Sequence, residues 1–549
     1  MKASSQGVKE PEGRSIQGDW DFASVWETVA ATVPDRVALR HGELSRSWRE
    51  FGRRADGVAA ALLGAGLGRQ DKVALYLHNG PEYLEATFAA LKAGLVPVNT
   101  NYRYVRDELL YLWSNADAAA VVFHGRFAER AAEVRPRCPD VRLWLHVDDG
   151  SGSCPGWAVP YEDAEARAPM QPGWERSGDG LILIYTGGTT GLPRGVMWRQ
   201  HDLFLASNTT ADPPLMDLAH VRARLAEATP PVGLPGAPLM HGTSFVFAAT
   251  ILNRGGTVVT LTSPGFEVTE LLDAVMEQRV TDLCIVGDAF CRPIVDALDR
   301  EPGRWDLSSL RFVSSSGMMW SPATKARLLA HAPDVLMIDF LNSSEASGLG
   351  RSMTSARKAE QGARFRLGEN AFVLAEDGTR LLPGSGTPGR LAVSGHIPLG
   401  YYKDAAKSAA TFPVIDGVRC AVPGDYATVE TDGSITLLGR GSISINTGGE
   451  KVFPEEVEEA IKRFPGVRDA LVVGVADERF GQSVAAAVEL AGDAGTLDRE
   501  ALIGHLRGQL AGYKLPRVVM PVDSIGRAPN GKADYPGTAR RVSAWLRGE

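Results

Sequence analysis

The segment from Tyr185 to Gly195, YTGGTTGLPRG, has the composition of a loop that binds phosphate. Glycines let backbone N–H groups approach an anion closely, and successive N–H groups form a concave anion nest. The threonine hydroxyls add hydrogen-bond donors, and the guanidinium of Arg194 adds a fixed positive charge. On composition alone, a Gly/Thr-rich surface loop is an equally good interpretation. The spacing differs from the pattern GxxxxGK(S/T), which argues against an ordinary P-loop ATPase.

Further short motifs with charged or hydrogen-bonding side chains follow this loop along the chain. They are APLMH ending at His241, SSGM ending at Met318, NSSE ending at Glu345, GD ending at Asp425, GR ending at Arg440, NTGGE ending at Glu450 and GRAPNGK ending at Lys532. Taken alone, each has an ordinary structural interpretation: His241 as a structural histidine, Asp425 as a turn cap, Glu345 as a solvated carboxylate. Their order along one chain is what argues for a shared site.

This ordered set resembles the adenylate-forming superfamily, which contains acyl-CoA synthetases, luciferases and the adenylation domains of peptide synthetases. In that family the phosphate loop reads (S/T)(S/G)G(S/T)TGxPKG. The resemblance extends from about residue 20 to residue 540. The runs YTGGTTGLPRGVMWRQHDLF and SISINTGGEKVFPEEVEEA are most similar to actinobacterial-type fatty-acid or steroid side-chain acyl-CoA synthetases.

The resemblance implies a catalytic site for ATP, Mg2+ and a carboxylic acid. Lys532 is then the catalytic lysine, His241 lies beside the substrate carboxylate, and Glu345 lies near the metal. The implied ATP-binding residues are Thr186, Gly187, Gly188, Thr189, Thr190, Gly191, Arg194, Gly317, Met318, Leu341, Asn342, Ser344, Asp425, Arg440 and Lys532.

The resemblance also implies a site for CoA and a hinge. Gly448 and Gly449 would line the path of the pantetheine thiol, where a side chain blocks close approach. Ser442 falls at the hinge position, about which the C-terminal domain rotates between the two half-reactions. A serine in place of the frequent Asp or Lys is tolerable there, because a hinge has only to absorb backbone rotation.

Three residues of the nucleotide site depart from the family pattern. Arg194 stands where Lys is usual, which keeps the charge and changes the geometry. Leu341 replaces an aromatic ring that lies against adenine, and Asn342 replaces a Gly. None of these changes removes a charge that catalysis needs, so we expect an active enzyme with altered nucleotide packing.

The predicted activity is an AMP-forming acid–thiol ligase that acts on a hydrophobic acid, a medium- or long-chain fatty acid or a steroid side-chain acid. The residues expected near the acyl group, Thr243–Phe247 and Met318–Trp320, are apolar, which argues against an amino-acid substrate. One alternative is an acyl-AMP ligase that loads a carrier protein. Another is a nucleotide-binding regulator without turnover.

The surrounding sequence predicts the elements that hold these motifs. Apolar runs such as Lys72–Leu77, Leu181–Thr186 and Val335–Asp339 alternate with helical patterns such as Pro81–Leu91, which favours parallel sheets covered by helices. After about Phe372, short strands between Gly, Pro and Asp turns indicate a small β-rich unit. The formal GxGxxG at 384–389 precedes a strand, so we interpret it as a turn rather than a Rossmann motif.

The fold class predicted from these patterns is α/β. It consists of a large N-terminal body, with two doubly wound α/β subdomains and a small β-rich subdomain, followed by a small α+β C-terminal domain, which the resemblance makes mobile. The predicted boundaries are a flexible tail at 1–20, an adenylation domain at 21–440 and the C-terminal domain at 441–549. A helix is expected from Pro454, with Val457, Ala460, Ile461 and Phe464 on its apolar face.

Composition restricts the remaining function classes. The 549 residues carry a net charge of −8, which argues against a basic nucleic-acid surface. The five cysteines show no metal spacing, so we expect reduced thiols in a cytoplasmic protein. No apolar run is long enough to span a membrane. The expected partners are therefore the small-molecule acid, ATP and CoA, without nucleic acid or stable membrane insertion; a homodimer is left open.

Overall fold

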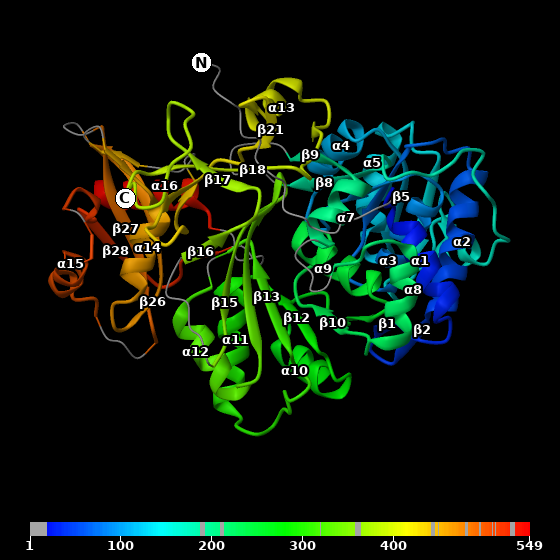
Figure 1. Cartoon of the computed structure of the whole chain (residues 1–549), viewed down its shortest axis with the longest axis horizontal. Helices are drawn as coiled ribbons and strands as arrows, with labels where there is room; N and C mark the ends of the chain where they lie inside the picture. Colours follow the sequence, from blue (N-terminus) through cyan, green and yellow to red (C-terminus); the bar gives the residue numbers. More distant parts are fainter. Residues whose placement is uncertain are drawn as a thin grey trace, which may run out of the picture. The chain divides into compact units, whose positions relative to one another are not determined.

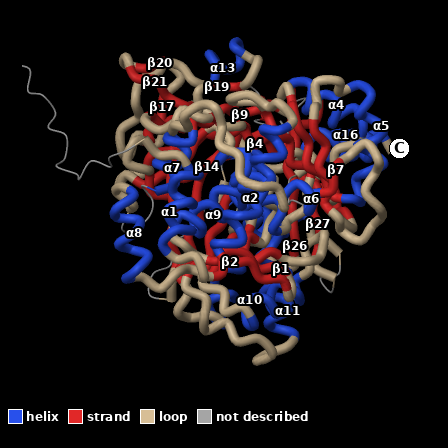
Figure 2. Tube along the Cα trace, turned by 90° about the vertical axis from the view of Figure 1, so that its right-hand side faces the viewer, coloured by secondary structure: helices blue, strands red, loops and turns tan. Residues whose placement is uncertain are grey.

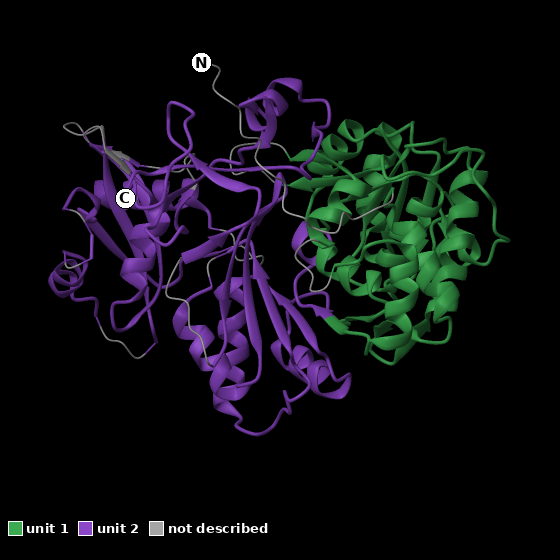
Figure 3. Ribbon diagram, in the orientation of Figure 1, with its two compact units in different colours: residues 1–233, 245–262 green, residues 234–244, 263–549 purple. Residues whose placement is uncertain are grey.

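The computed structural model describes residues 19–186, 193–208, 214–318, 320–356, 364–440, 445–447, 450–477, 481–492, 496–507, 509–510, 512–527 and 533–548. The chain divides into two compact units, residues 1–233 with 245–262 and residues 234–244 with 263–549 (Figure 3). The predicted boundary at 440/441 stays a prediction.

Unit 1 alternates strands and helices, as the sequence predicts. Its strands are β1 (Val37–His41), β2 (Leu44–Ser47), β3 (Lys72–Tyr76), β4 (Val96–Asn99), β5 (Ala118–His124), β6 (Leu143–Val147), β7 (Val159–Pro160), β8 (Leu181–Thr186), β9 (Arg194–Arg199) and β11 (Thr257–Thr260). Its helices are α1 (Phe22–Thr32), α2 (Trp48–Gly64), α3 (Pro81–Lys92), α4 (Arg106–Asn115), α5 (Ala128–Val134), α6 (Tyr161–Glu165), α7 (Gln200–Asn208) and α8 (Leu218–Glu227) (Figure 1). Along the chain, β10 (Val232–Pro235) and α9 (Gly242–Asn253) each contain a point where the two units divide.

The main sheet of unit 1 has the strand order β9-β8-β4-β3-β5-β6-β7. All its pairings are parallel except β8 with β9, which form an antiparallel hairpin. Local signals set the covering helices: Ser47 and Glu50 form a capping box at α2, and Pro81 starts α3 with its fixed φ. The near-continuous burial of β3 and β5 matches a parallel sheet that is covered on both faces.

Unit 2 begins with alternating helices and strands and continues with antiparallel strands. Its first part contains α10 (Val268–Glu277), β12 (Asp282–Ile285), α11 (Gly287–Arg300), β13 (Phe312–Ser316), α12 (Pro322–His331) and β14 (Leu336–Ser343). The strands that follow are β15 (Ala346–Thr354), β16 (Arg364–Leu367), β17 (Ala371–Leu374), β18 (Gly389–Ser394), β19 (Gly400–Tyr401), β20 (Val414–Ile415), β21 (Val418–Ala421), β22 (Asp425–Val429) and β23 (Ser434–Arg440), with the short helix α13 (Ala405–Thr411).

In this unit β12, β13 and β14 are parallel neighbours, and β15, β16, β23, β22, β18 and β21 continue the sheet with antiparallel pairings. Helices α10 and α11 lie side by side in both views (Figures 1 and 2). The short strands after Phe372 match the predicted β-rich region. Residues 384–388 form a loop that leads into β18 at Gly389, as expected of a turn, with Gly384 and Gly386 at positive φ.

The last part of unit 2 is a small α+β region. Its elements are β24 (Ile445–Thr447), β25 (Glu450–Val452), α14 (Pro454–Lys462), β26 (Val467–Asp477), β27 (Gly481–Leu490), α15 (Arg499–Arg507), β28 (Val518–Val522) and α16 (Tyr535–Arg547). Val472 of β26 packs in one core with α14 and α15, whereas Val473 packs in another core with α16. Burial on both faces explains why β26 is apolar without alternation.

All five cysteines are free thiols, in agreement with the prediction. Within the described ranges, no helix is both long and apolar enough to cross a membrane.

Candidate functional site

The two ends of the predicted phosphate loop meet at the end of the β8–β9 hairpin in unit 1. Thr186, the last residue of β8, pairs with Arg194, the first residue of β9. The hairpin therefore places the Arg194 position beside the start of the loop. The predicted residues between them, Gly187, Gly188, Thr189, Thr190 and Gly191, lie outside the described residues.

Two asparagines that we did not predict hold the strand before this loop. The side-chain oxygen of Asn99 accepts a 2.6 Å hydrogen bond from the backbone N–H of Tyr185, and its amide donates to the Tyr185 carbonyl at 2.9 Å. The hydroxyl of Tyr185 donates to Oδ1 of Asn115 at 2.6 Å. A Cβ at Gly195, opposite Tyr185, would lie 2.6 Å from the tyrosine ring. Gly195 is thus required for packing at this position.

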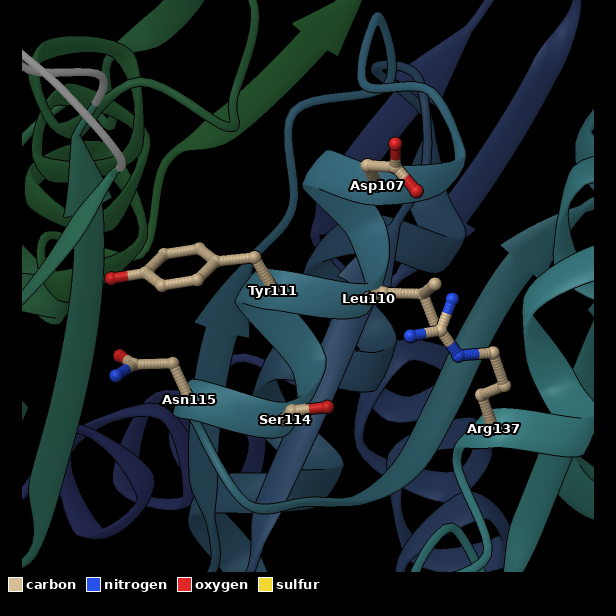
Figure 4. A pocket seen from close by; sticks show the side chains of 6 residues that line it. All are labelled: Asp107, Leu110, Tyr111, Ser114, Asn115 and Arg137. Carbon is tan, nitrogen blue, oxygen red and sulfur yellow. The ribbon is translucent and has the colours of Figure 1, made fainter.

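An open cavity of about 500 Å³ lies beside α4 in the same unit. Tyr111 and Asn115 extend to one side of the helix, and Arg137 faces Leu110 on the other (Figure 4). None of the residues predicted for the site lines this cavity. Its relation to the loop is through Asn115, which accepts the hydrogen bond from Tyr185.

In unit 2, several predicted residues lie at the carboxyl ends of parallel strands. Gly317 and Met318 directly follow β13, and Leu341 and Asn342 lie near the end of β14. Because β13 and β14 are parallel neighbours, with Ser316 opposite Phe340, these positions share one edge of the sheet. That edge is where open α/β sheets bind ligands.

The chain before His241 approaches the same edge. The N–H of Gly236 donates to the carbonyl of Cys284 in β12, at 2.8 Å. His241 follows five residues later, immediately before α9, and its N–H donates to the Pro238 carbonyl at 3.0 Å. Its half-buried side chain thus belongs to a segment attached to β12, the strand next to β13.

Glu345 lies with Ser344 in the turn between β14 and β15, and its side chain has a partner that we did not predict. The hydroxyl of Tyr401 donates a 2.8 Å hydrogen bond to Oε1 of Glu345. The Tyr401 ring is 5% exposed and packs against Phe412, so it is a rigid support. This hydrogen bond restrains the orientation of the Glu345 carboxylate.

The chemistry of Glu345 fits Mg2+, which is commonly held by one or two carboxylates together with substrate phosphates and water. Among the described residues, no group of three or more His, Cys, Asp or Glu side chains is arranged as a metal site. A protein-only metal cage is therefore not found in this part of the chain, whereas a site shared with nucleotide phosphates requires only a carboxylate of this kind.

Asn342, which replaces a family glycine, has a structural function in the β14–β15 turn. Its Oδ1 accepts a 2.8 Å hydrogen bond from the N–H of Gly348, a residue with φ of 76°. The same turn contains Ser344 and Glu345. The side chain that the sequence marked as a departure thus stabilises the turn that presents Glu345.

The other predicted polar pair occupies facing positions on antiparallel strands. Asp425, the first residue of β22, is opposite Arg440, the last residue of β23. Gly424 precedes them with φ of 102°, a conformation that favours glycine. The predicted ribose-binding residues are thus neighbours in the sheet, although they are separated by fifteen positions in the sequence.

The structure does not describe the remaining predicted residues. Lys532, the hinge residue Ser442 and the CoA-site residues Gly448 and Gly449 lie outside the described residues. Sequence reasoning missed three residues that support the site: Asn99, Asn115 and Tyr401. Each acts through a partner distant in sequence, and no local motif marks it.

Comparison with known proteins identifies the family. The model of the AMP-binding enzyme family matches residues 26–402, and that of the AMP-binding enzyme C-terminal domain matches residues 456–532. A medium/long-chain-fatty-acid--CoA/3-oxocholest-4-en-26-oate--CoA ligase of Mycolicibacterium smegmatis is 42% identical over 528 residues, which cover 94% of this chain and 95% of the relative. A 3-oxocholest-4-en-26-oate--CoA ligase of Rhodococcus rhodochrous is 39% identical over 530 residues, 94% of each chain.

The fold is also similar to that of a solved structure. The crystal structure of the anthranilate CoA ligase AuaEII in complex with anthranoyl-AMP superposes with a TM-score of 0.81 at 19% identity, and covers 96% of this chain and 98% of that one. The predicted family, α/β fold class and enzyme class are confirmed. The chain therefore belongs to the AMP-binding enzyme family and is an AMP-forming acid–thiol ligase.

Proposed function

We propose that this enzyme forms the CoA thioester of a hydrophobic carboxylic acid, either a medium- or long-chain fatty acid or a steroid side-chain acid. The observation that carries the proposal is the 42% identity, over 94% of the chain, to a relative named for both substrate classes. Neither Thr243–Phe247 nor Met318–Trp320 contains a charged residue, and most of their side chains are apolar, which agrees with a hydrocarbon substrate.

The reaction proceeds in two steps. A carboxylate oxygen attacks the α-phosphorus of ATP, the bond to the bridging oxygen breaks, and pyrophosphate leaves with that electron pair. The CoA sulfur then attacks the acyl carbon, the bond to AMP breaks, and the thiol proton passes to solvent. Adenylation is needed because hydroxide is a poor leaving group whereas AMP is a good one.

The residues act chiefly by positioning and by charge. The first step brings a carboxylate to an anionic phosphate, so positive charge and N–H donors must offset the growing negative charge. We assign that task to the loop from Thr186 to Arg194 and to Lys532. His241 orients the acid.

The nucleotide and the thiol are assigned to separate groups of residues. The segments at 317–318 and 341–344 contact adenine, and Asp425 and Arg440 bind the ribose hydroxyls. Gly448 and Gly449 line the thiol path, and Ser442 is the hinge.

We assign Mg2+ to Glu345, whose carboxylate Tyr401 orients. When bound, the metal neutralises phosphate charge. Glu345 itself would supply one anionic ligand whose orientation Tyr401 restrains, which lowers the cost of assembling the site around ATP. Because a single protein carboxylate is assigned, occupancy of this site depends on nucleotide phosphates.

The test is pyrophosphate release with ATP and Mg2+ across acids from acetate to palmitate, aryl acids and steroid side-chain acids. Each reaction runs with and without CoA, and mass spectrometry detects the thioester. CoA-dependent acyl-CoA from a long-chain or steroid acid supports the proposal. Acid-dependent adenylate without thioester indicates transfer to a carrier protein, and no release with any acid refutes turnover. A cytoplasmic location and a homodimer stay predictions.

A further inference from the structure

A buried ion pair lies directly behind the sheet edge that we assign to adenine. Nζ of Lys325, on α12, is 3.5 Å from Oδ2 of Asp339, on β14. The two residues are 5% and 4% exposed. Burial raises the pKa of Asp339 to about 7, an effect that the lysine charge opposes. Such a pair is weak evidence for stability in itself, because desolvation offsets its attraction.

The position of this pair connects both segments of the adenine edge. Asp339 pairs with Ser315 in the β13–β14 register, and it precedes Leu341 by two residues on the same strand. The Lys325 ammonium is also 5.1 Å from the centre of the Trp320 ring, which is 1% exposed. One cation therefore contacts Asp339, on the strand that carries Leu341, and Trp320, in the segment that follows Met318.

A second set of contacts fixes the other side of that segment. Oδ1 of Asp288, on α11, accepts hydrogen bonds from the Ser321 N–H at 3.0 Å and from the Thr324 hydroxyl at 2.5 Å. The N–H of Gly287 donates to Oγ of Ser315 at 2.9 Å. Polar contacts therefore anchor both ends of the segment between β13 and α12: a buried one at Ser315 and partly buried ones at Ser321 and Thr324.

We propose that Lys325 and Asp339 are positioning residues for ATP, which hold the Gly317–Met318 turn and the end of β14 in the geometry that binds adenine. This inference rests on the nucleotide site of the proposed function and extends it to residues that touch no substrate. A misplacement of about 1 Å caused by a change far from the chemistry costs about 100-fold in rate. The turn and the strand end held by this pair are assigned to adenine, so we expect their displacement to lower ATP affinity.

The experiment measures the dissociation constant of ATP by calorimetry for the wild-type enzyme, D339N and the double variant K325M/D339N. Melting temperature is measured in parallel. D339N leaves a buried lysine without its partner, whereas the double variant removes both charges and regains stability. The matched control is E85Q in unit 1, where Glu85 pairs with Arg54 at 2.8 Å, both are at most 2% exposed, and burial also raises the carboxyl pKa to about 7.

We expect ATP affinity to fall about 10- to 100-fold in D339N and to stay reduced in the double variant after its melting temperature recovers. E85Q should melt lower and bind ATP as the wild type does. A double variant with wild-type ATP affinity, or a loss of affinity in E85Q equal to that in D339N, overturns the inference. Because binding is read without turnover, a wild-type enzyme that binds ATP and releases no pyrophosphate refutes the proposed function alone. A wild-type enzyme that does not bind ATP refutes both.

Discussion

Removing the Tyr401 hydroxyl tests whether the orientation of Glu345 matters for adenylation. In Y401F the ring keeps its packing against Phe412, and the 2.8 Å hydrogen bond to Oε1 of Glu345 is lost. A hydrogen bond to a charged group contributes about 1.5–3 kcal/mol, which corresponds to about 10- to 150-fold in rate. Since the carboxylate is half-buried, we expect a loss near the lower end in kcat/KM for acid-dependent pyrophosphate release, with a higher Mg2+ concentration required for half-maximal rate.

The chain offers a matched control at Tyr426, whose hydroxyl donates to Oε1 of the exposed Glu376 at 3.3 Å. Y426F removes the same kind of bond, and in a strand successive side chains point to opposite faces, so it leaves Asp425 in place. We expect wild-type rate and Mg2+ dependence in Y426F. If Y401F also keeps both, the assignment of Glu345 to the metal through this contact is refuted.

Three further changes test other parts of the chain. G195A places a methyl group 2.6 Å from the Tyr185 ring, so adenylation should fall at least about tenfold, measured by ATP–pyrophosphate exchange; wild-type exchange would show that the ring moves without consequence. G449V should spare pyrophosphate release and lower acyl-CoA formation, and an equal loss of both would remove Gly449 from the thiol path. Burial raises the pKa of Glu458 from 4.5 to about 7, so the folded state holds this proton where the unfolded state releases it, and the stability it contributes is lost as pH rises through 7. Between pH 5 and pH 8, the melting temperature of E458Q should therefore fall by less than that of the wild type. Parallel curves of melting temperature against pH would contradict that pKa.

Much of the architecture was predictable because it depends on local patterns. The strand at Lys72–Tyr76 and the helix from Pro81 follow from apolar runs and from a proline at the first helical turn. The helix from Pro454 buries Val457, Ala460 and Ile461, as its spacing predicts. It ends at Lys462, so the fourth predicted residue, Phe464, lies beyond the helix and packs partly buried against the same core. The spacing of apolar residues and the prolines that start helices are properties of a few neighbouring residues, so they can be recognised in the sequence itself.

The supporting contacts of the site were not predictable in the same way. Tyr401 reaches Glu345 across fifty-six positions, and Asn99 reaches Tyr185 across eighty-six. Neither residue stands at a spacing that carries a chemical pattern, and their partners are known only once the strands are paired. The replacement at Asn342 is a related case, because its hydrogen bond to Gly348 depends on the particular turn between β14 and β15.

In the nucleotide site that we propose, these observations separate the residues assigned to the chemistry from the residues that hold them in place. The chemical residues stand in short motifs, because a loop or a turn can present several donors at once. The supporting residues are single side chains on neighbouring elements, such as Tyr401 and Asp339, and they act through buried contacts. In that proposed site, we expect a departure such as Leu341 to change one surface against the nucleotide, and the loss of a supporting residue to displace a whole turn. We therefore expect supporting residues to affect ATP affinity more than the replacement of the adenine-facing ring does.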